Sequence, residues 1–175
     1  MKWFTYRNFS VLDREGKVYG YGRSVWALID TDTRQPTDIL AFDDGRVKRC
    51  TDAKYLCPID AVSRVKITDN IQRWHTLVTA YSDVDMNGHI NSVKYIEHLL
   101  NLWSMTFHAT HPIKRIDVAY VAEAYGGDTL HFDVETLDEL TYAVRIIRQA
   151  KGQSTEQEVC RCKVQFAETL RPKKQ

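Results

Sequence analysis

Acidic, amide and imidazole side chains alternate in a short segment near the middle of the chain. Asp85, Asn87 and His89 occupy every second position, so in an extended loop all three would point to the same side. A carboxylate, an amide and an imidazole can together orient a water molecule, exchange its proton and hold a polarised oxygen. The spacing therefore predicts a catalytic loop.

An amphipathic segment follows this loop directly. Its apolar residues recur at steps of three and four, at Val93, Ile96, Leu100, Trp103 and Phe107. This spacing is typical of a helix that buries one face, and it predicts one long helix. Free N–H groups and the positive end of the helix dipole collect at a helix N-terminus. We therefore expect the backbone N–H groups of residues 88–91 to hold a developing oxyanion.

The segment from Ser82 to Ile96 resembles the signature S-D-L-D-M-N-x-H-V-N-N-x-x-Y-I of acyl-acyl-carrier-protein (acyl-ACP) thioesterases, fatty-acid chain-terminating enzymes with two tandem hotdog domains. Gly88 stands where plant members usually have Gln, and Ser92 replaces one Asn. The Gly-His-Asn run is also similar to hotdog thioesterases that act on coenzyme A esters. The strict D-x-N-x-H spacing favours the carrier-protein group.

A second segment, Ile116 to Ala124, resembles the family pattern L-D-Y-x-x-E-C. The resemblance implies that Glu123 is the family's catalytic Glu, on the strand after the helix. Ala124 occupies the position where plant members have a Cys once suspected of being the nucleophile. A methyl group cannot attack a thioester, so this chain cannot use such a nucleophile.

The resemblance implies a site of four residues: Asp85, Asn87, His89 and Glu123. Glu123 would act as the base, or orient the water together with His89. Asn87 would hold the water or the thioester oxygen, and Asp85 would orient the other loop side chains. Each residue also has an ordinary structural explanation. Asp85 or Asn87 can cap the helix, His89 can be a core histidine, and Glu123 can be a surface carboxylate. Their joint occurrence at the family spacing favours catalysis.

Strand patterns surround the helix. They cover residues 73–82, 114–124, 129–137, 142–150 and 158–170. One helix with several antiparallel strands predicts an α+β domain. The resemblance implies the hotdog fold, an antiparallel sheet wrapped around a long helix. It assigns residues 71–170 to a complete second hotdog domain, residues 41–70 to a linker and residues 171–175 to a tail.

Residues 1–40 form a separate part, in which two alternating strand patterns flank the turn at residues 13–17. The resemblance identifies this part as the C-terminal hairpin of an incomplete first hotdog domain. The alternative is a divergent N-terminal extension. An isolated two-stranded hairpin is only marginally stable in water. We therefore expect it either to dock on the second domain or, preferentially, to be buried in a symmetric homodimer.

Composition sets outer limits on function. The chain has 175 residues, is 43% hydrophobic and has a formal net charge of +1. The near-zero charge argues against a nucleic-acid partner, and no apolar run reaches the length of a membrane helix, about 20 residues. We expect a cytoplasmic protein with reduced thiols. Cys160 and Cys162 would share one strand face, and no cysteine spacing indicates zinc. His108 and His111 are interpreted as helix-end residues. No metal and no cofactor is expected.

The resemblance implies that the chain hydrolyses the thioester of fatty acyl-acyl-carrier protein, which releases free fatty acid and ends chain elongation. Two alternatives remain: an acyl-CoA hotdog thioesterase, and a non-catalytic acyl-binding module. Acyl carrier proteins are acidic, so a docking surface would be basic. The candidate cations are Lys114, Arg115, Arg145, Arg148, Arg161, Lys163 and the tail residues Arg171, Lys173 and Lys174.

Overall fold

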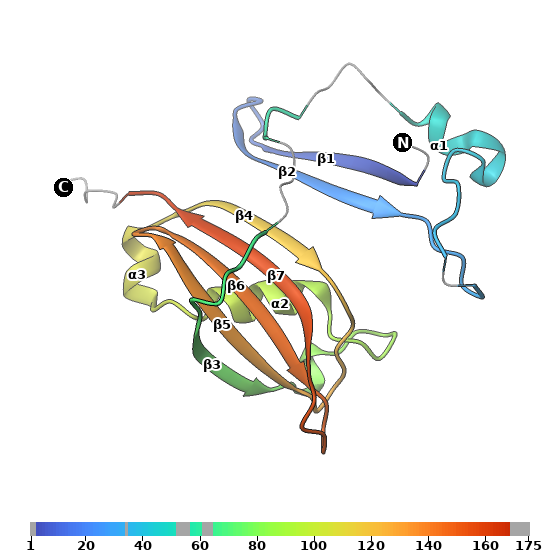
Figure 1. Cartoon of the computed structure of the whole chain (residues 1–175). Coiled ribbons are helices and arrows are strands. Elements are labelled where there is room, and N and C mark those ends of the chain that lie inside the picture. The colour runs from blue at the N-terminus through green and yellow to red at the C-terminus, as the bar shows by residue number, and fades with distance from the viewer. Residues whose placement is uncertain (1–2, 34, 52–56, 61–64, 169–175) are drawn as a thin grey trace. The chain divides into compact units, whose positions relative to one another are not determined.

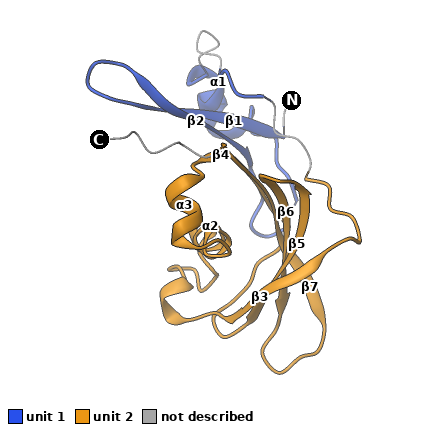
Figure 2. Ribbon diagram, turned by 90° about the vertical axis from the view of Figure 1, so that its left-hand side faces the viewer, with its two compact units in different colours: residues 1–62 blue, residues 63–175 orange. Residues whose placement is uncertain are grey.

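The computed structural model of the protein describes residues 3–33, 35–51, 57–60 and 65–168. The basic tail candidates at residues 171–174 therefore lie outside the described residues. The chain divides into two compact units, residues 1–62 and residues 63–175 (Figure 2). Each unit is described by itself.

The first unit is built on a hairpin, as the alternating patterns predict. Strand β1 (Phe4–Leu12) pairs antiparallel with β2 (Val18–Ala27). The turn between them closes because Asp13 Oδ1 accepts the N–H groups of Glu15 and Lys17 at 3.1 and 2.8 Å. The hairpin keeps large apolar side chains exposed, among them Phe9 and Val11, at 55% and 64%.

Two short helices follow in the segment that was interpreted as the linker. They are η1 (Phe42–Gly45) and α1 (Arg46–Arg49), and both belong to the first unit.

The second unit contains a five-stranded sheet in the order β3-β5-β6-β7-β4, antiparallel at every pair (Figure 1). Its strands are β3 (Gln72–Val78), β4 (Ile113–Tyr120), β5 (Thr129–Asp138), β6 (Thr141–Gln149) and β7 (Glu156–Phe166). The five predicted strands are confirmed, and so is the α+β class. Three of the strands end earlier than expected: β3 stops at Val78, before the 3-10 turn η2 (Tyr81–Asp83), β4 stops at Tyr120 and β7 stops at Phe166.

The prediction of one long helix is wrong. The chain instead forms α2 (Ser92–Leu100) and α3 (Met105–Thr110), on one face of the sheet (Figure 2). Ser104 starts the second helix, because its Oγ accepts the N–H of Phe107 at 3.2 Å. At the break lies Trp103, which is 9% exposed, with its ring 5.0 Å from Phe166 and 5.1 Å from Tyr142. The apolar periodicity continues across the break, so the pattern alone could not reveal it.

The buried face of α2 also differs from the prediction. Val93 is 54% exposed, whereas Tyr95 and Leu99 are 3% and 0% exposed. The apolar pattern did not include Tyr95, yet its aromatic ring is part of the core. Both residues belong to a core whose sheet side consists of Leu130, Phe132, Val134, Val144, Ile146, Val159, Cys160, Cys162, Val164 and Phe166.

The opposite face of the sheet is charged. Alternation along β5 places Asp133 and Glu135 there, because Phe132 and Val134 belong to the core. The chain before β3 crosses this face: the carbonyl of Val65 accepts from Arg161 at 3.5 Å, and Thr68 donates to both carboxylate oxygens of Glu135 at 2.6 and 2.8 Å. Figure 1 shows this green segment running across the sheet.

Asp133 is the centre of an ionic network on this face. It is 4% exposed and lies 2.8 Å from Arg73 and 3.3 Å from Arg145. Burial acts to raise the pKa of its carboxyl, but the hydrogen bonds and charges of Arg73 and Arg145 outweigh burial and hold the pKa below its ordinary value. A depressed folded-state pKa means that ionised Asp133 stabilises the fold above its unfolded-state pKa, about 3.9, and that this contribution is lost as the pH falls through the folded value.

We expect Asp133→Asn to lower the free energy of unfolding at pH 7 by about 3 kcal/mol, since two partly buried guanidinium groups lose their shared carboxylate. The cost should shrink as the pH falls through the lowered folded-state pKa of Asp133, because the parent carboxyl is then protonated as well. Urea unfolding followed at the β5 amide signals measures both values. Glu97→Gln, an exposed carboxylate on α2, is the matched control and should leave stability nearly unchanged. If Asp133→Asn is as stable as the parent at pH 7, the ion pairs of Asp133 do not stabilise the fold.

Candidate active site

The polar loop is a tight turn, so the expectation of an extended loop is wrong. The N–H of Asp85 donates to the carbonyl of His89 at 2.8 Å, and Asp85 Oδ1 accepts the N–H groups of Asn87 and His89 at 2.8 and 3.3 Å. Gly88 completes the turn at φ +82°, a conformation that favours glycine. The short carboxylate of Asp85 bonds its own backbone, which is what folds the loop back.

The turn opens on a cavity of 230 Å³. Its lining residues are Asp85, His89, Ile90, Asn91, Ser92, Tyr95, Tyr120, Ala122 and Glu123. Three of the four expected site residues are therefore brought together: Asp85, His89 and Glu123. Asn87, the fourth, is exposed and does not line this cavity.

His89 and Glu123 form the central contact of the cavity. Nε2 of His89 lies 3.6 Å from Oε2 of Glu123, and the two side chains are 35% and 48% exposed. An imidazole and a carboxylate at this distance can share a water molecule and move its proton. The pair is open to solvent, so a substrate can reach both groups.

Glu123 does not lie on a strand, contrary to expectation. Strand β4 ends at Tyr120, and the N–H groups of Val121 and Ala122 both donate to the carbonyl of Val159, at 2.8 and 3.2 Å. This irregular pairing stops the ladder and frees the next residues from the sheet. Glu123 therefore sits on the connection after β4.

Main-chain pairing joins this connection to the turn. His89 and Tyr125 form an isolated antiparallel bridge, and the N–H of Ile90 donates to the carbonyl of Ala124 at 2.8 Å. Residues far apart in sequence are thereby fixed side by side. The His89–Glu123 contact is a consequence of this backbone pairing.

The backbone N–H groups of residues 88–91 are not available as oxyanion donors, contrary to expectation. Gly88 donates to Asp85 O, His89 to Asp85 Oδ1, Ile90 to Ala124 O and Asn91 to Asp83 O. Asn91, rather than Asp85 or Asn87, caps α2, since its Oδ1 accepts the N–H of Val93 at 3.0 Å. Within the described part of the chain, the first N–H of α2 without a hydrogen-bond acceptor is that of Ser92.

Asp83 and His98 are functional-site residues that the sequence analysis missed. Asp83 is 5% exposed; its Oδ2 accepts the N–H of Ala80 at 2.8 Å, and its Oδ1 lies 3.0 Å from Nε2 of His98 on α2. Its carbonyl also accepts from Asn91. One buried carboxylate thus ties the start of the turn to the helix. The signal was present in the sequence, where Asp83 is the first acidic residue of the motif.

Two tyrosines complete the cavity. Burial raises the pKa of Tyr95 to about 12 and also raises the pKa of Tyr120. The hydroxyl of Tyr120 donates to the carbonyl of Ser92 at 2.9 Å. Both phenols are therefore protonated at neutral pH and can act as hydrogen-bond donors but not as bases.

The remaining sequence candidates have structural partners. Cys160 and Cys162 share a buried strand face as predicted, with their sulfurs 3.7 Å apart. The contact with Cys162 and burial raise the pKa of the Cys160 thiol, which makes it a poor nucleophile. His108 and His111 each contact a helix-end carbonyl, of Leu100 and Phe107. In the described ranges, no group of three or more His, Cys, Asp or Glu side chains could hold a metal ion.

The expected basic surface is largely neutralised. Four of the candidate arginines each face a carboxylate. The pairs are Arg115–Asp117 at 2.7 Å, Arg145–Asp133 at 3.3 Å, Arg148–Asp128 at 2.6 Å and Arg161–Glu158. These arginines are held within the sheet and its turns, so they offer less charge to a partner than the sequence suggested.

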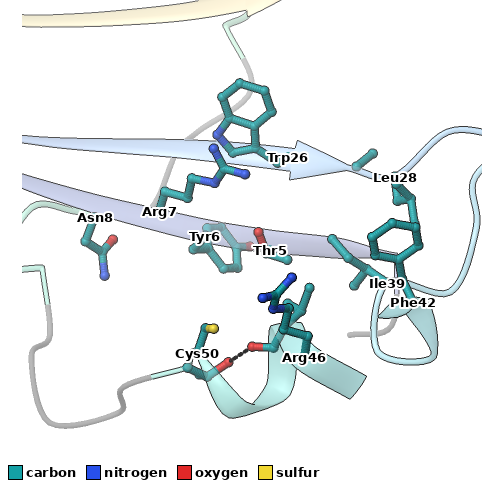
Figure 3. A pocket seen from close by; sticks show the side chains of 13 residues that line it. Thr5, Tyr6, Arg7, Asn8, Trp26, Leu28, Ile39, Phe42, Arg46 and Cys50 are labelled. Atoms are coloured by element: carbon teal, nitrogen blue, oxygen red, sulfur yellow. Dashed lines mark hydrogen bonds between the residues drawn. The ribbon is translucent and has the colours of Figure 1, made fainter. Parts of the chain in front are cut away.

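A second hollow, of 770 Å³, lies within the first unit between the hairpin and α1 (Figure 3). Apolar side chains such as Ile39 and Phe42 line it together with Arg7, whose guanidinium lies 4.4 Å from the ring centre of Trp26. None of the expected catalytic residues borders this hollow. Among the described residues, no helix is both long and apolar enough to cross a membrane.

Comparison with known proteins identifies the class. The chain is similar to a solved acyl-ACP thioesterase from Bacteroides thetaiotaomicron (TM-score 0.82, 41% identity), which covers 95% of this chain. It is also similar in fold to the 12:0-ACP thioesterase from Umbellularia californica (TM-score 0.72, 19% identity, 95% of this chain). The protein is thus a hotdog-fold protein, as expected.

The family follows from sequence models of its two domains. The model of the acyl-ACP thioesterase C-terminal domain matches residues 67–168, and the model of the N-terminal domain matches residues 1–42. The chain belongs to the acyl-ACP thioesterase family. It spans 64% of the length of each of the two solved structures. No curated protein sequence matches the chain.

We expect Asp83→Asn to lower the free energy of unfolding by about 2 kcal/mol, since a buried charge-assisted hydrogen bond to His98 is lost while the side-chain volume is kept. Amide exchange at Asn91, which donates to the carbonyl of Asp83, should accelerate more than exchange in the β6 strand. Asp69→Asn, an exposed carboxylate before β3, is the control. Equal protection of Asn91 in the variant and the parent would show that Asp83 does not hold the turn.

Proposed function

We propose that this chain hydrolyses the thioester of fatty acyl-acyl-carrier protein, which releases free fatty acid and ends chain elongation. The observation that supports it best is the contact of His89 with Glu123, 3.6 Å apart at an open cavity. Membership of the acyl-ACP thioesterase family supports the same reaction and carrier. The substrate would enter as an acyl chain on the thiol of an acidic carrier protein.

In the proposed reaction Glu123 is the base. Its carboxylate takes a proton from a water molecule whose oxygen bonds to the thioester carbonyl carbon. The C–S bond then breaks, and the protonated Glu123 gives the proton to the leaving thiolate. His89 orients the water from the other side, and Asp85 keeps the turn folded through its hydrogen bonds to the backbone of Asn87 and His89.

The oxyanion needs a donor close to the water. We assign this role to the N–H of Ser92, which lines the cavity at the N-terminus of the nine-residue helix α2. The helix dipole adds positive potential there. Asn87 keeps the proposed role of holding the water or the thioester oxygen through its amide. Because it does not line the cavity, the substrate must extend past the cavity rim to meet it.

The domain organisation is part of the proposal. Residues 71–170 would form the complete second hotdog domain and residues 1–40 the C-terminal hairpin of a first one, with residues 41–70 as the linker. A cytoplasmic location fits a soluble carrier-protein substrate. The exposed apolar side chains of the hairpin, such as Phe9 and Val11, support burial in a symmetric homodimer.

We expect His89→Ala and Glu123→Gln each to lower hydrolysis by about 10²-fold or more, because general acid–base catalysis contributes on this scale. Both side chains are well exposed, so stability should change little. Steady-state hydrolysis of a fatty acyl-ACP measures the effect. His75→Gln and Glu97→Gln provide matched surface controls. Rates within twofold of the parent for both site variants would refute the assignment.

The same assay compares carriers. Acyl-ACP and acyl-CoA with the same fatty acid should differ in kcat/KM in favour of acyl-ACP. Carboxylates neutralise Arg115, Arg145 and Arg148, so the basic surface that would favour an acidic carrier is smaller than the sequence suggests. Preference for acyl-CoA would favour the acyl-CoA thioesterase, and binding of acyl chains without turnover would favour the non-catalytic module.

For the homodimer we expect sedimentation of the purified chain at micromolar concentration to show one species of twice the chain mass. Phe9→Ser combined with Val11→Ser should shift it to the monomer, because both substitutions remove exposed apolar surface from the hairpin. Val78→Ser, which is 66% exposed on β3, is the control. A monomeric parent whose residues 4–27 exchange amide protons slowly would rule out the dimer.

A further inference from the structure

One side chain touches both members of the proposed catalytic pair. The hydroxyl of Tyr125 donates to Oε2 of Glu123 at 3.3 Å, the same oxygen that faces His89. The ring of Tyr125 also meets the imidazole of His89 edge to face, with ring centres 5.2 Å apart and an interplanar angle of 80°. Tyr125 therefore constrains the carboxylate through its polar end and the imidazole through its apolar body.

The backbone of Tyr125 is held from two directions. Its N–H donates to Oδ2 of Asp128 at 2.9 Å, and its carbonyl accepts the hydroxyl of Thr79 at 2.9 Å. Asp128 and Thr79 are 4% and 5% exposed, so these bonds are shielded from water. Pairing with His89 across the bridge supplies the third restraint. The position of the ring follows from this fixed backbone.

Arg148 of β6 supports the ring. Its guanidinium carbon lies 4.8 Å from the ring centre of Tyr125, and its Nη1 donates to the carbonyl of Glu123 at 3.2 Å. Its Nε lies 2.6 Å from Oδ2 of Asp128, which also binds the N–H of Tyr125. The sequence suggested that Arg148 docks an acidic carrier. These contacts instead make it an internal brace of the site.

We propose that Tyr125 is a positioning residue for the Glu123–His89 pair, an inference that rests on the proposed hydrolysis. Its hydroxyl aims Oε2 of Glu123 at the water, and its ring prevents the His89 imidazole from turning away. A half-exposed carboxylate has several rotamers, and the hydrogen bond from Tyr125 favours the one in which Oε2 faces His89. Holding that rotamer before substrate arrives removes an entropic cost from the transition state.

Tyr125→Phe removes the hydroxyl but keeps the ring against His89 and Arg148. We expect kcat to fall about 10-fold with KM within twofold of the parent, since one hydrogen bond that matters for the chemical step is lost. Tyr125→Leu, which also removes the ring, should lower kcat further, by about 10²-fold. Tyr142→Phe is the matched control, because its hydroxyl bonds the carbonyl of Glu139 outside the site.

A double-variant cycle separates this inference from the proposed function. In Glu123→Gln the further change Tyr125→Phe should cost nothing more, because the hydroxyl acts only through that carboxylate. If Glu123→Gln is inactive while Tyr125→Phe matches the parent, the positioning role is refuted and the proposed function stands. If Glu123→Gln keeps full activity, Glu123 is not the base, and the positioning role of Tyr125 is refuted with it. If the parent chain itself does not hydrolyse acyl-ACP, the proposed function fails.

A measurement without turnover checks the geometry. The ring-proton signals of His89 should carry the ring-current shift of Tyr125 in the parent and in Tyr125→Phe, and should lose it in Tyr125→Leu. Unchanged His89 signals in Tyr125→Leu would overturn the proposal whatever the activities are. A urea midpoint of Tyr125→Phe equal to that of the parent excludes a loss of fold as the cause of a lower kcat.

Discussion

The buried carboxylate of Asp83 is the interaction on which the site depends. The carboxylate accepts the N–H of Ala80, just before η2, and lies beside the imidazole of His98, while the carbonyl of the same residue accepts the N–H of Asn91 at the start of α2. A buried charge without partners is strongly disfavoured, so these groups cannot move apart independently. Because α2 is fixed on the sheet by Tyr95 and Leu99, Asp83 transfers the rigidity of the core to the turn that contains His89.

Side-chain alternation along residues 85–89 does not predict the conformation of this segment. Asp85 bonds the backbone of Asn87 and His89, which folds the segment and separates side chains that alternation would align. The N–H of His89 bonds Asp85 Oδ1, and those of Gly88, Ile90 and Asn91 bond main-chain carbonyls, so the donors expected for an oxyanion are used for structure. The nearest N–H group available to an oxyanion is therefore that of Ser92, at the start of α2.

Several arginines of the second unit form ion pairs within the unit. Arg145 and Arg148 face carboxylates on a neighbouring strand or turn, and Arg161 faces Glu158 on its own strand. These three arginines therefore offer less charge to steer a partner. Asp128 has two partners, because its carboxylate contacts Arg148 and also accepts the N–H of Tyr125. The network that neutralises an arginine also supports the site.

The sequence by itself determined the family, the α+β class, the strands and the candidates Asp85, His89 and Glu123, because local patterns and motif spacing encode them. It could not reveal the break at residues 101–104, since the apolar period continues through Trp103 and only contacts with Tyr142 and Phe166 turn that ring to the sheet. It also could not reveal Tyr125 beside His89, or His98 beside Asp83. Those contacts join residues distant in the chain. Only the bridge between the turn and the connection after β4, and the contact of α2 with Asp83, bring them together.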